Sequence, residues 1–179
     1  MFAVREDYQQ ILTQVYAGLQ ETRLWSRVSG SCFCAAGFVS LVFNALGLRS
    51  RILPCYAVVI KDDMNFLVGY KNVIAAPGQV DGHVVCLIDN TILVDFGLKN
   101  VQRYAWPDFP DAVACEINPD NMFPGQLVLD ERRKILWAND WASPATDAVM
   151  RANKPVFKKL FKQYRSTQLY GNQCSLNIT

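Results

Sequence analysis

The feature that most limits the fold is a helix-length segment, about Cys32 to Leu46, that is apolar on almost every side. Ser29 or Ser31 precedes it as a candidate N-cap, and Gly47 follows it as a stop signal. Its apolar interior consists of Ala35, Ala36, Phe38, Val39, Leu41, Val42 and Phe43. A helix without a polar face must be covered all round, so we expect this one at the centre of the molecule.

The rest of the chain predicts one helix before this segment, then strands, then more helices. Residues 5–20 place apolar side chains at a 3.6-residue period. Strand-like runs follow the central helix at Ser50–Ile60, Asn65–Tyr70, His83–Ile88, Thr91–Phe96, Ala112–Ile117, Gln126–Leu129 and Lys134–Trp137. Ser143-Pro144 is typical of a helix start, and a final helix is expected after Pro155. This order predicts an α+β fold, with the central helix on an antiparallel sheet and covering helices at the C-terminus.

Composition narrows the class of protein. Apolar residues make up 51% of the chain and charged residues 19%, an ordinary globular balance, and the net charge of +2 is too small to indicate nucleic acid. The N-terminus lacks a signal-peptide layout and no run reaches the length of a membrane span. We therefore expect a cytoplasmic protein whose cysteines are free thiols. No metal site is expected, because no Cys-x-x-Cys pair is present and Cys32-x-Cys34 with one distant histidine lacks the usual ligand spacing. No cofactor is expected either. Residues 1–179 are expected to form one domain, with 140–179 as a C-terminal helical extension.

The chain has one histidine, His83, so any thiol–imidazole chemistry must use it. His83 opens one strand-like run, Asp95 closes the next, and Cys32 stands at the start of the central helix. A helix N-terminus beside an imidazolium stabilises a cysteine thiolate. An imidazole then acts as base and acid, and a carboxylate fixes its tautomer. Cys32, His83 and Asp95 are of the right types for these three roles.

The loop between the two strands provides a test of this grouping. A two-residue turn at Asp89-Asn90 would put His83 and Asp95 on opposite faces of the sheet. A three-residue loop puts both on one face, directly opposite or on a diagonal, and Asn90 tolerates the left-handed conformation that such loops use. We therefore predict a loop of odd length.

Other residues are candidates for substrate contact. Gly30 and Ser31 would let the chain turn sharply and present backbone N–H groups to an oxyanion. Trp25 either donates its indole N–H to that oxyanion or, as we favour, packs. Gln79, with Asp81, is expected to line the cleft from the loop before His83.

Two further features have a competing interpretation. Cys34 is a rival nucleophile, but a residue two positions along a helix points about 200° away from Cys32, so only one can face His83. The last helix has a basic side formed by Lys154, Lys158, Lys159, Lys162 and Arg165. We interpret that side as solvated rather than as a contact for nucleic acid or a membrane surface.

The motifs resemble a known superfamily. Gly30-Ser31-Cys32, with Ala36 four residues on and then Ala45-Leu46-Gly47, resembles the transglutaminase-like signature, and Gly82-His83 and Val94-Asp95 resemble its histidine and aspartate strands. Val94-Asp95-Phe96-Gly97 is also similar to the aspartate segment of arylamine N-acetyltransferases, a branch of the same papain-like superfamily. The resemblance covers about residues 27–97 and points to a small bacterial family of unknown function. It implies a papain-like fold with Cys32 as nucleophile, His83 as base and Asp95 as orienting carboxylate.

The sequence thus predicts a cysteine-dependent hydrolase or acyltransferase that acts on an amide, ester or thioester through an acyl-enzyme. The expected partner is a peptide or a small acyl or amide substrate. The alternative is a catalytically silent papain-like domain used for binding, in which Cys32 is structural.

Overall fold

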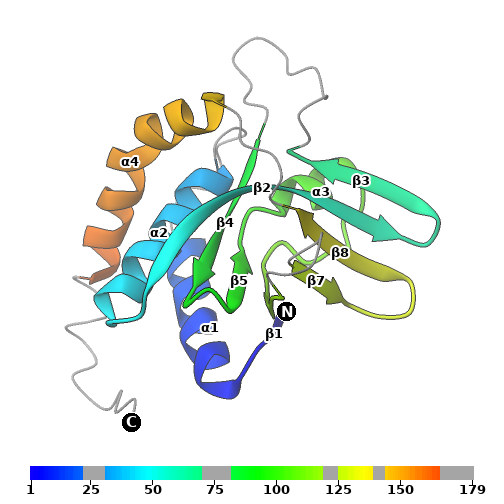
Figure 1. The fold of residues 1–179 in the computed structure, drawn as a ribbon, viewed down its shortest axis with the longest axis horizontal. Helices are drawn as coiled ribbons and strands as arrows, with labels where there is room; N and C mark the ends of the chain where they lie inside the picture. The colour runs from blue at the N-terminus through cyan, green and yellow to red at the C-terminus, as the bar shows by residue number, and fades with distance from the viewer. Residues whose placement is uncertain (22–30, 70–81, 119–124, 139–143, 166–179) are drawn as a thin grey trace.

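The computed structural model describes residues 1–21, 31–69, 82–118, 125–138 and 144–165, and their arrangement is α+β, as predicted (Figure 1). The helices of this part are α1 (Glu6–Gln20), α2 (Ser31–Ala45), α3 (Lys99–Tyr104) and α4 (Pro144–Tyr164). The strands are β1 (Phe2–Ala3), β2 (Ser50–Lys61), β3 (Met64–Val68), β4 (His83–Ile88), β5 (Ile92–Asp95), β6 (Val113–Glu116), β7 (Gly125–Val128) and β8 (Arg133–Ala138).

The strands form one strongly curved sheet in the order β1-β6-β5-β4-β2-β8-β7, with β3 paired to β2. The long strand β2 connects its two parts, because residues 50–55 pair with β4 and residues 56–61 pair with β8. An isolated bridge between Ile117 and Gly125 then joins the end of β6 to the start of β7. The sheet therefore comes back on itself and has an inner face, like a barrel.

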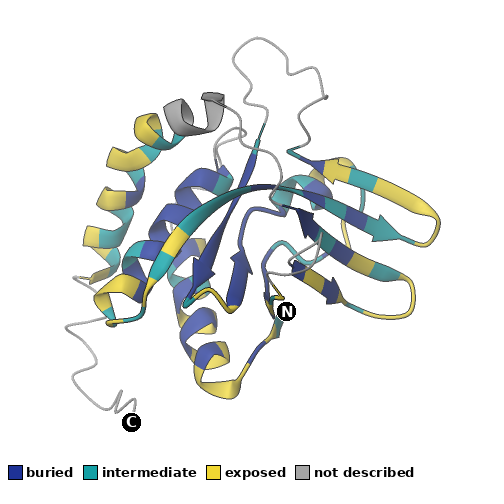
Figure 2. Cartoon of the chain, in the orientation of Figure 1, coloured by how far each residue is buried: buried dark blue, intermediate teal, exposed yellow. Residues whose placement is uncertain are grey.

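Each face of the sheet has its own apolar core. On the inner face, buried side chains from β2, β4, β5, β7 and β8 pack together, among them Val85, Leu93, Ile135 and Trp137. The outer face packs against α1 and α2 and includes Val84, Cys86 and Val94. Because successive strand residues point to opposite faces, β4 and β5 are buried on both sides, which explains their continuous apolar runs (Figure 2).

Helix α2 is the central buried helix that its composition predicts. Residues 33–40 are all buried, and the helix contacts α1, α4, β2, β4 and β5. Helix α4 covers α2 rather than the sheet: the ring of Phe157 lies so close to Gly37 that a Cβ there would sit 2.5 Å from it. The predicted basic side of α4 is exposed at Lys154, Lys158, Lys159, Lys162 and Arg165.

Two expectations from the sequence are corrected, and one element was not expected. The helix expected to begin after Pro155 is part of α4, which runs through that proline; Pro155 is exposed, and Met150 before it and Phe157 after it both pack into the α2 core. The sheet is not wholly antiparallel, since β1 pairs with β6 in parallel. Helix α3 was not anticipated, because its six residues bury only Val101.

Candidate functional site

His83 and Asp95 meet inside the curved sheet. His83 is the first residue of β4 and Asp95 the last of β5, and their side chains are 1% and 0% exposed. The His83 Nε2 atom lies 2.7 Å from Asp95 Oδ2, a hydrogen-bond distance. Since neighbouring strands carry the two residues, backbone pairing fixes their separation.

The loop between β4 and β5 confirms the prediction of odd length. Cys86 pairs with Val94 and Ile88 with Ile92, which leaves residues 89–91 as a three-residue loop. Asp89 and Asn90 have positive φ angles of 47° and 56°, and the Thr91 N–H donates to the Ile88 carbonyl. In this register Asp95 lies diagonally from His83 on the same face, so the two side chains can meet.

Asp95 accepts three hydrogen bonds from the described residues. Its Oδ2 accepts from His83 and from Trp137 Nε1 at 2.8 Å, and its Oδ1 accepts from the Gly97 backbone N–H at 2.8 Å. An ionised carboxylate offers only acceptors, so all three partners present N–H groups. The Nε2 atom of His83 therefore carries a proton, which leaves the other ring nitrogen, Nδ1, for a second partner.

Cys32 lies next to the His83 ring. It is the second residue of α2, is only partly buried, and its side chain contributes to the pKa of His83. Gly97 shows how closely the groups approach: a Cβ built on it would lie 2.6 Å from Cys32 Cβ and 2.8 Å from His83 Cε1. The start of α2 and the ends of β4 and β5 thus bring Cys32, His83 and Asp95 together.

The environment of His83 favours its protonated form. Burial lowers the pKa of His83, but the charge of Asp95, the hydrogen bond to Asp95 and the contact with Cys32 together raise the pKa above its usual 6.5. A protonated imidazole beside a cysteine stabilises the thiolate. The arrangement is therefore suited to hold a thiolate and a proton side by side.

The chain matches no protein-family model, no curated protein and no solved structure. Among the described residues, no three His, Cys, Asp or Glu side chains are grouped so that they could hold a metal ion, and no helix is long and apolar enough to cross a membrane.

The other described cysteines are poor nucleophiles. Cys34, the predicted rival, is buried under α4 with its Sγ 3.3 Å from Asn153 Oδ1, away from His83. Burial raises the pKa of the Cys115 thiol to about 12 and raises the pKa of Cys86 as well; the pKa of Cys55 is raised by burial and by the charge of Asp95. Within the described part of the chain, Cys32 is the one cysteine that is not buried.

The remaining candidates divide by location. Ser31 is the first residue of α2, directly before Cys32 in the chain, and it is buried. Trp25, Gly30 and Gln79, together with Asp81, lie outside the described residues.

Sequence reasoning missed Trp137 as a member of this cluster. It lies 42 positions after Asp95, on a strand that does not pair with β5. The available signal was weak: a buried indole N–H needs an acceptor, but the sequence does not say which one.

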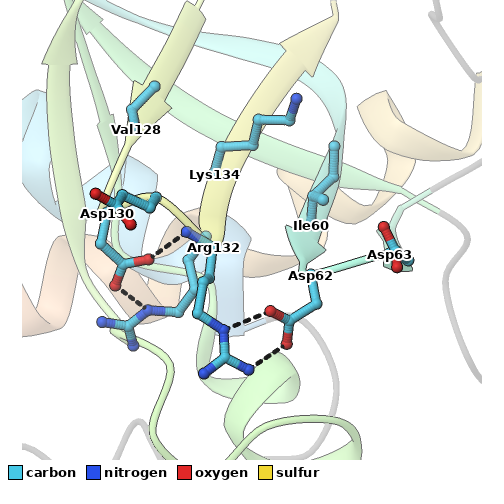
Figure 3. A pocket seen from close by; sticks show the side chains of 9 residues that line it. Ile60, Asp62, Asp63, Val128, Asp130, Arg132 and Lys134 are labelled. Atoms are coloured by element: carbon cyan, nitrogen blue, oxygen red, sulfur yellow. Dashed lines mark hydrogen bonds and ion pairs between the residues drawn. The ribbon is translucent and has the colours of Figure 1, made fainter.

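A separate surface hollow of about 370 Å³ lies at the turns β2–β3 and β7–β8 (Figure 3). Four of its charged groups form two pairs, since Arg132 donates to both oxygens of Asp62 and Arg133 donates to Asp130. Exposed pairs of this kind contribute little to stability. The hollow shares no lining residue with the Cys32 site.

Proposed function

We propose that this chain is a cysteine-dependent hydrolase or acyltransferase, with Cys32 as nucleophile, His83 as base and acid, and Asp95 as orienting carboxylate. The observation that carries the proposal is the buried His83 ring, which is hydrogen-bonded to Asp95 through Nε2 and lies close to Cys32 next to Gly97. A cysteine at a helix start, with histidine and aspartate on adjacent strands, also supports a papain-like, transglutaminase-like assignment of the fold.

The first half-reaction forms an acyl-enzyme. The Cys32 thiolate attacks the carbonyl carbon of the substrate, a C–S bond forms, and the carbonyl electron pair moves onto oxygen. When the intermediate collapses, the bond to the leaving amine, alcohol or thiol breaks, and that group takes a proton from His83. Asp95 keeps Nε2 of the ring fixed, so the other nitrogen stays directed at the reacting atoms.

The second half-reaction releases the acyl group. His83 takes a proton from water or from another acceptor, whose oxygen or nitrogen attacks the thioester carbon. The C–S bond breaks and the Cys32 thiolate is regenerated. Water as acceptor gives hydrolysis and an amine gives acyl transfer, and neither route requires a cofactor.

The start of α2 provides a donor for the oxyanion. Because the helix begins at Ser31, the backbone N–H of Cys32 lies in its first turn and has no helical carbonyl to bond. N–H groups at a helix start favour negative charge. We place the substrate carbonyl oxygen near this N–H, with peptide or glutamine side-chain amides as the first substrate class to examine.

The test is the pH dependence of Cys32 alkylation by iodoacetamide, followed by peptide mass spectrometry. An ordinary thiol with a pKa of about 8.5 reacts roughly 200-fold more slowly at pH 6 than at pH 9. Cys32 is expected to differ by less than about tenfold between these pH values, because an adjacent imidazolium stabilises its thiolate. His83→Ala should restore the ordinary ratio.

Val85→Ala is the matched control, because Val85 is buried two residues along the same strand and on the same face. It should keep the reactive ratio of the wild type. An ordinary ratio in the wild-type protein refutes the enzyme proposal and leaves a binding domain in which Cys32 is structural.

A further inference from the structure

Trp137 reaches the Cys32 site from across the interior of the curved sheet. It is the largest fully buried side chain of the described residues, with 0% exposure. It belongs to β8, and in the sheet β4 and β2 both lie between β8 and the strand of Asp95. Its indole Nε1 nevertheless donates to Asp95 Oδ2 at 2.8 Å.

The bond from Trp137 ends on the oxygen that also holds His83. Asp95 Oδ2 therefore has two N–H donors, one from the imidazole and one from the indole, while Oδ1 is held by Gly97. A carboxylate held at both oxygens cannot turn about its χ2 bond without breaking a buried hydrogen bond. The direction of the lone pairs that face His83 is then fixed by groups other than His83.

We propose that Trp137 is a positioning residue for the Cys32–His83–Asp95 group, an inference that rests on the proposed function of that group. It holds the Asp95 carboxylate in one orientation, and so keeps the His83 ring directed at Cys32. If Trp137 served only to fill the core, its ring system alone would be sufficient and its N–H would not matter. The positioning role requires the indole N–H, because a buried carboxylate that loses one of its donors is less fixed in direction.

Two substitutions separate the N–H from the ring. Trp137→Phe removes the indole N–H and part of the ring, whereas replacing Trp137 with the benzothiophene analogue of tryptophan removes the N–H and keeps the shape. Phe109→Leu is the control: Phe109 is a buried aromatic of the same inner core, and its side chain has no hydrogen-bonding group. It should lower stability without changing the site.

The first measurement is direct and needs no substrate. Since His83 is the only histidine, its ring Nε2 proton can be followed in ¹⁵N-histidine-labelled protein. Both Trp137 variants should exchange this proton with water about tenfold faster than the wild type, because a carboxylate that has lost its bond to Trp137 can turn and leave the Nε2 proton without its acceptor more often. An unchanged exchange rate in the benzothiophene variant overturns the proposal.

The second measurement is the ratio of Cys32 alkylation rates at pH 6 and pH 9. Both Trp137 variants should lower the pH 6 rate about tenfold and leave the pH 9 rate within twofold of the wild type, because the thiolate forms at pH 9 without help. A pH 6 rate that is unchanged or increased overturns the proposal. If wild-type Cys32 has an ordinary ratio, the proposed function fails, while the proton-exchange measurement still tests whether Trp137 positions His83.

Discussion

Replacing Asp95 with asparagine tests the whole hydrogen-bond arrangement with almost no change of shape. The wild-type carboxylate accepts three N–H groups, from His83, Trp137 and Gly97. Asparagine has one acceptor oxygen and one NH₂ group, which only donates. In either orientation of the amide, at least one buried N–H must therefore face another donor.

The better orientation can be worked out from the structure. If the amide oxygen takes the place of Oδ2, it keeps His83 and Trp137, and only the Gly97 N–H faces the NH₂ group. The opposite orientation leaves two donors unpaired. One unpaired buried N–H costs about 1–3 kcal/mol, and the two remaining bonds lose their charge, so we expect Asp95→Asn to lower the free energy of unfolding by about 3–5 kcal/mol.

The assay is urea unfolding at pH 7, with Cys32 alkylation at pH 6 measured on the same samples. Asp89→Asn is the matched control: Asp89 accepts from the Arg49 N–H and the Tyr8 hydroxyl, and that hydroxyl can equally accept from an amide. Its positive φ also suits asparagine, so we expect a change within about 0.5 kcal/mol. If Asp95→Asn costs no more than Asp89→Asn, the three-donor arrangement is wrong and Asp95 cannot be the orienting group.

Three further predictions concern the same site. Gly97→Ala would place a methyl group 2.6 Å from Cys32 Cβ, so Cys32 must move away from His83 and its alkylation should return to the ordinary ratio of pH 6 to pH 9 rates. Burial lowers the pKa of His83, but Asp95 and Cys32 raise it by more, so the net shift is upward from 6.5. ¹⁵N NMR should therefore show the ring still protonated at pH values above 6.5. Cys34→Ala should leave Cys32 alkylation unchanged and cost about 1 kcal/mol in thermal unfolding, because it removes a buried thiol and its contact with Asn153.

Each of these three has its own contrary result or control. Gly37→Ala is the control for Gly97→Ala. Gly37 lies in α2, the helix of Cys32, and an added Cβ would lie 2.5 Å from the Phe157 ring of α4, so the change strains α2 but should keep the reactive ratio of alkylation rates. A titration midpoint for His83 at or below 6.5 would contradict the role of Asp95. Loss of Cys32 reactivity on changing Cys34 would show that the two thiols act together.

The central helix and most strands were predictable because a segment that is buried on all sides is apolar at nearly every position of the sequence. The apolar segment expected from Cys32 to Leu46 is α2, and His83–Ile88 is β4 to the residue. The side-chain period of two made the loop length decisive, and the observed loop at residues 89–91 agrees. Those features depend on neighbours close in the chain.

The missed features depend on distant contacts. Trp137 joins the site through a curved sheet whose closure at Ile117 and Gly125 has no local signal. The two-residue β1 exists only because β6 lies beside it. Helix α4 continues through Pro155 because packing on both sides of the proline outweighs its cost, which a local rule about proline cannot foresee.

The position of Trp137 so late in the sequence has a consequence during protein synthesis. A ribosome makes Cys32, His83 and Asp95 well before β8, yet β8 supplies the donor that crosses to Asp95. A growing chain stopped before residue 133 would carry all three side chains without that donor, and without the strand that closes the sheet beyond β2. The Asp95 carboxylate therefore gains its donor from Trp137 only when β8, the last strand of the described residues, has been made.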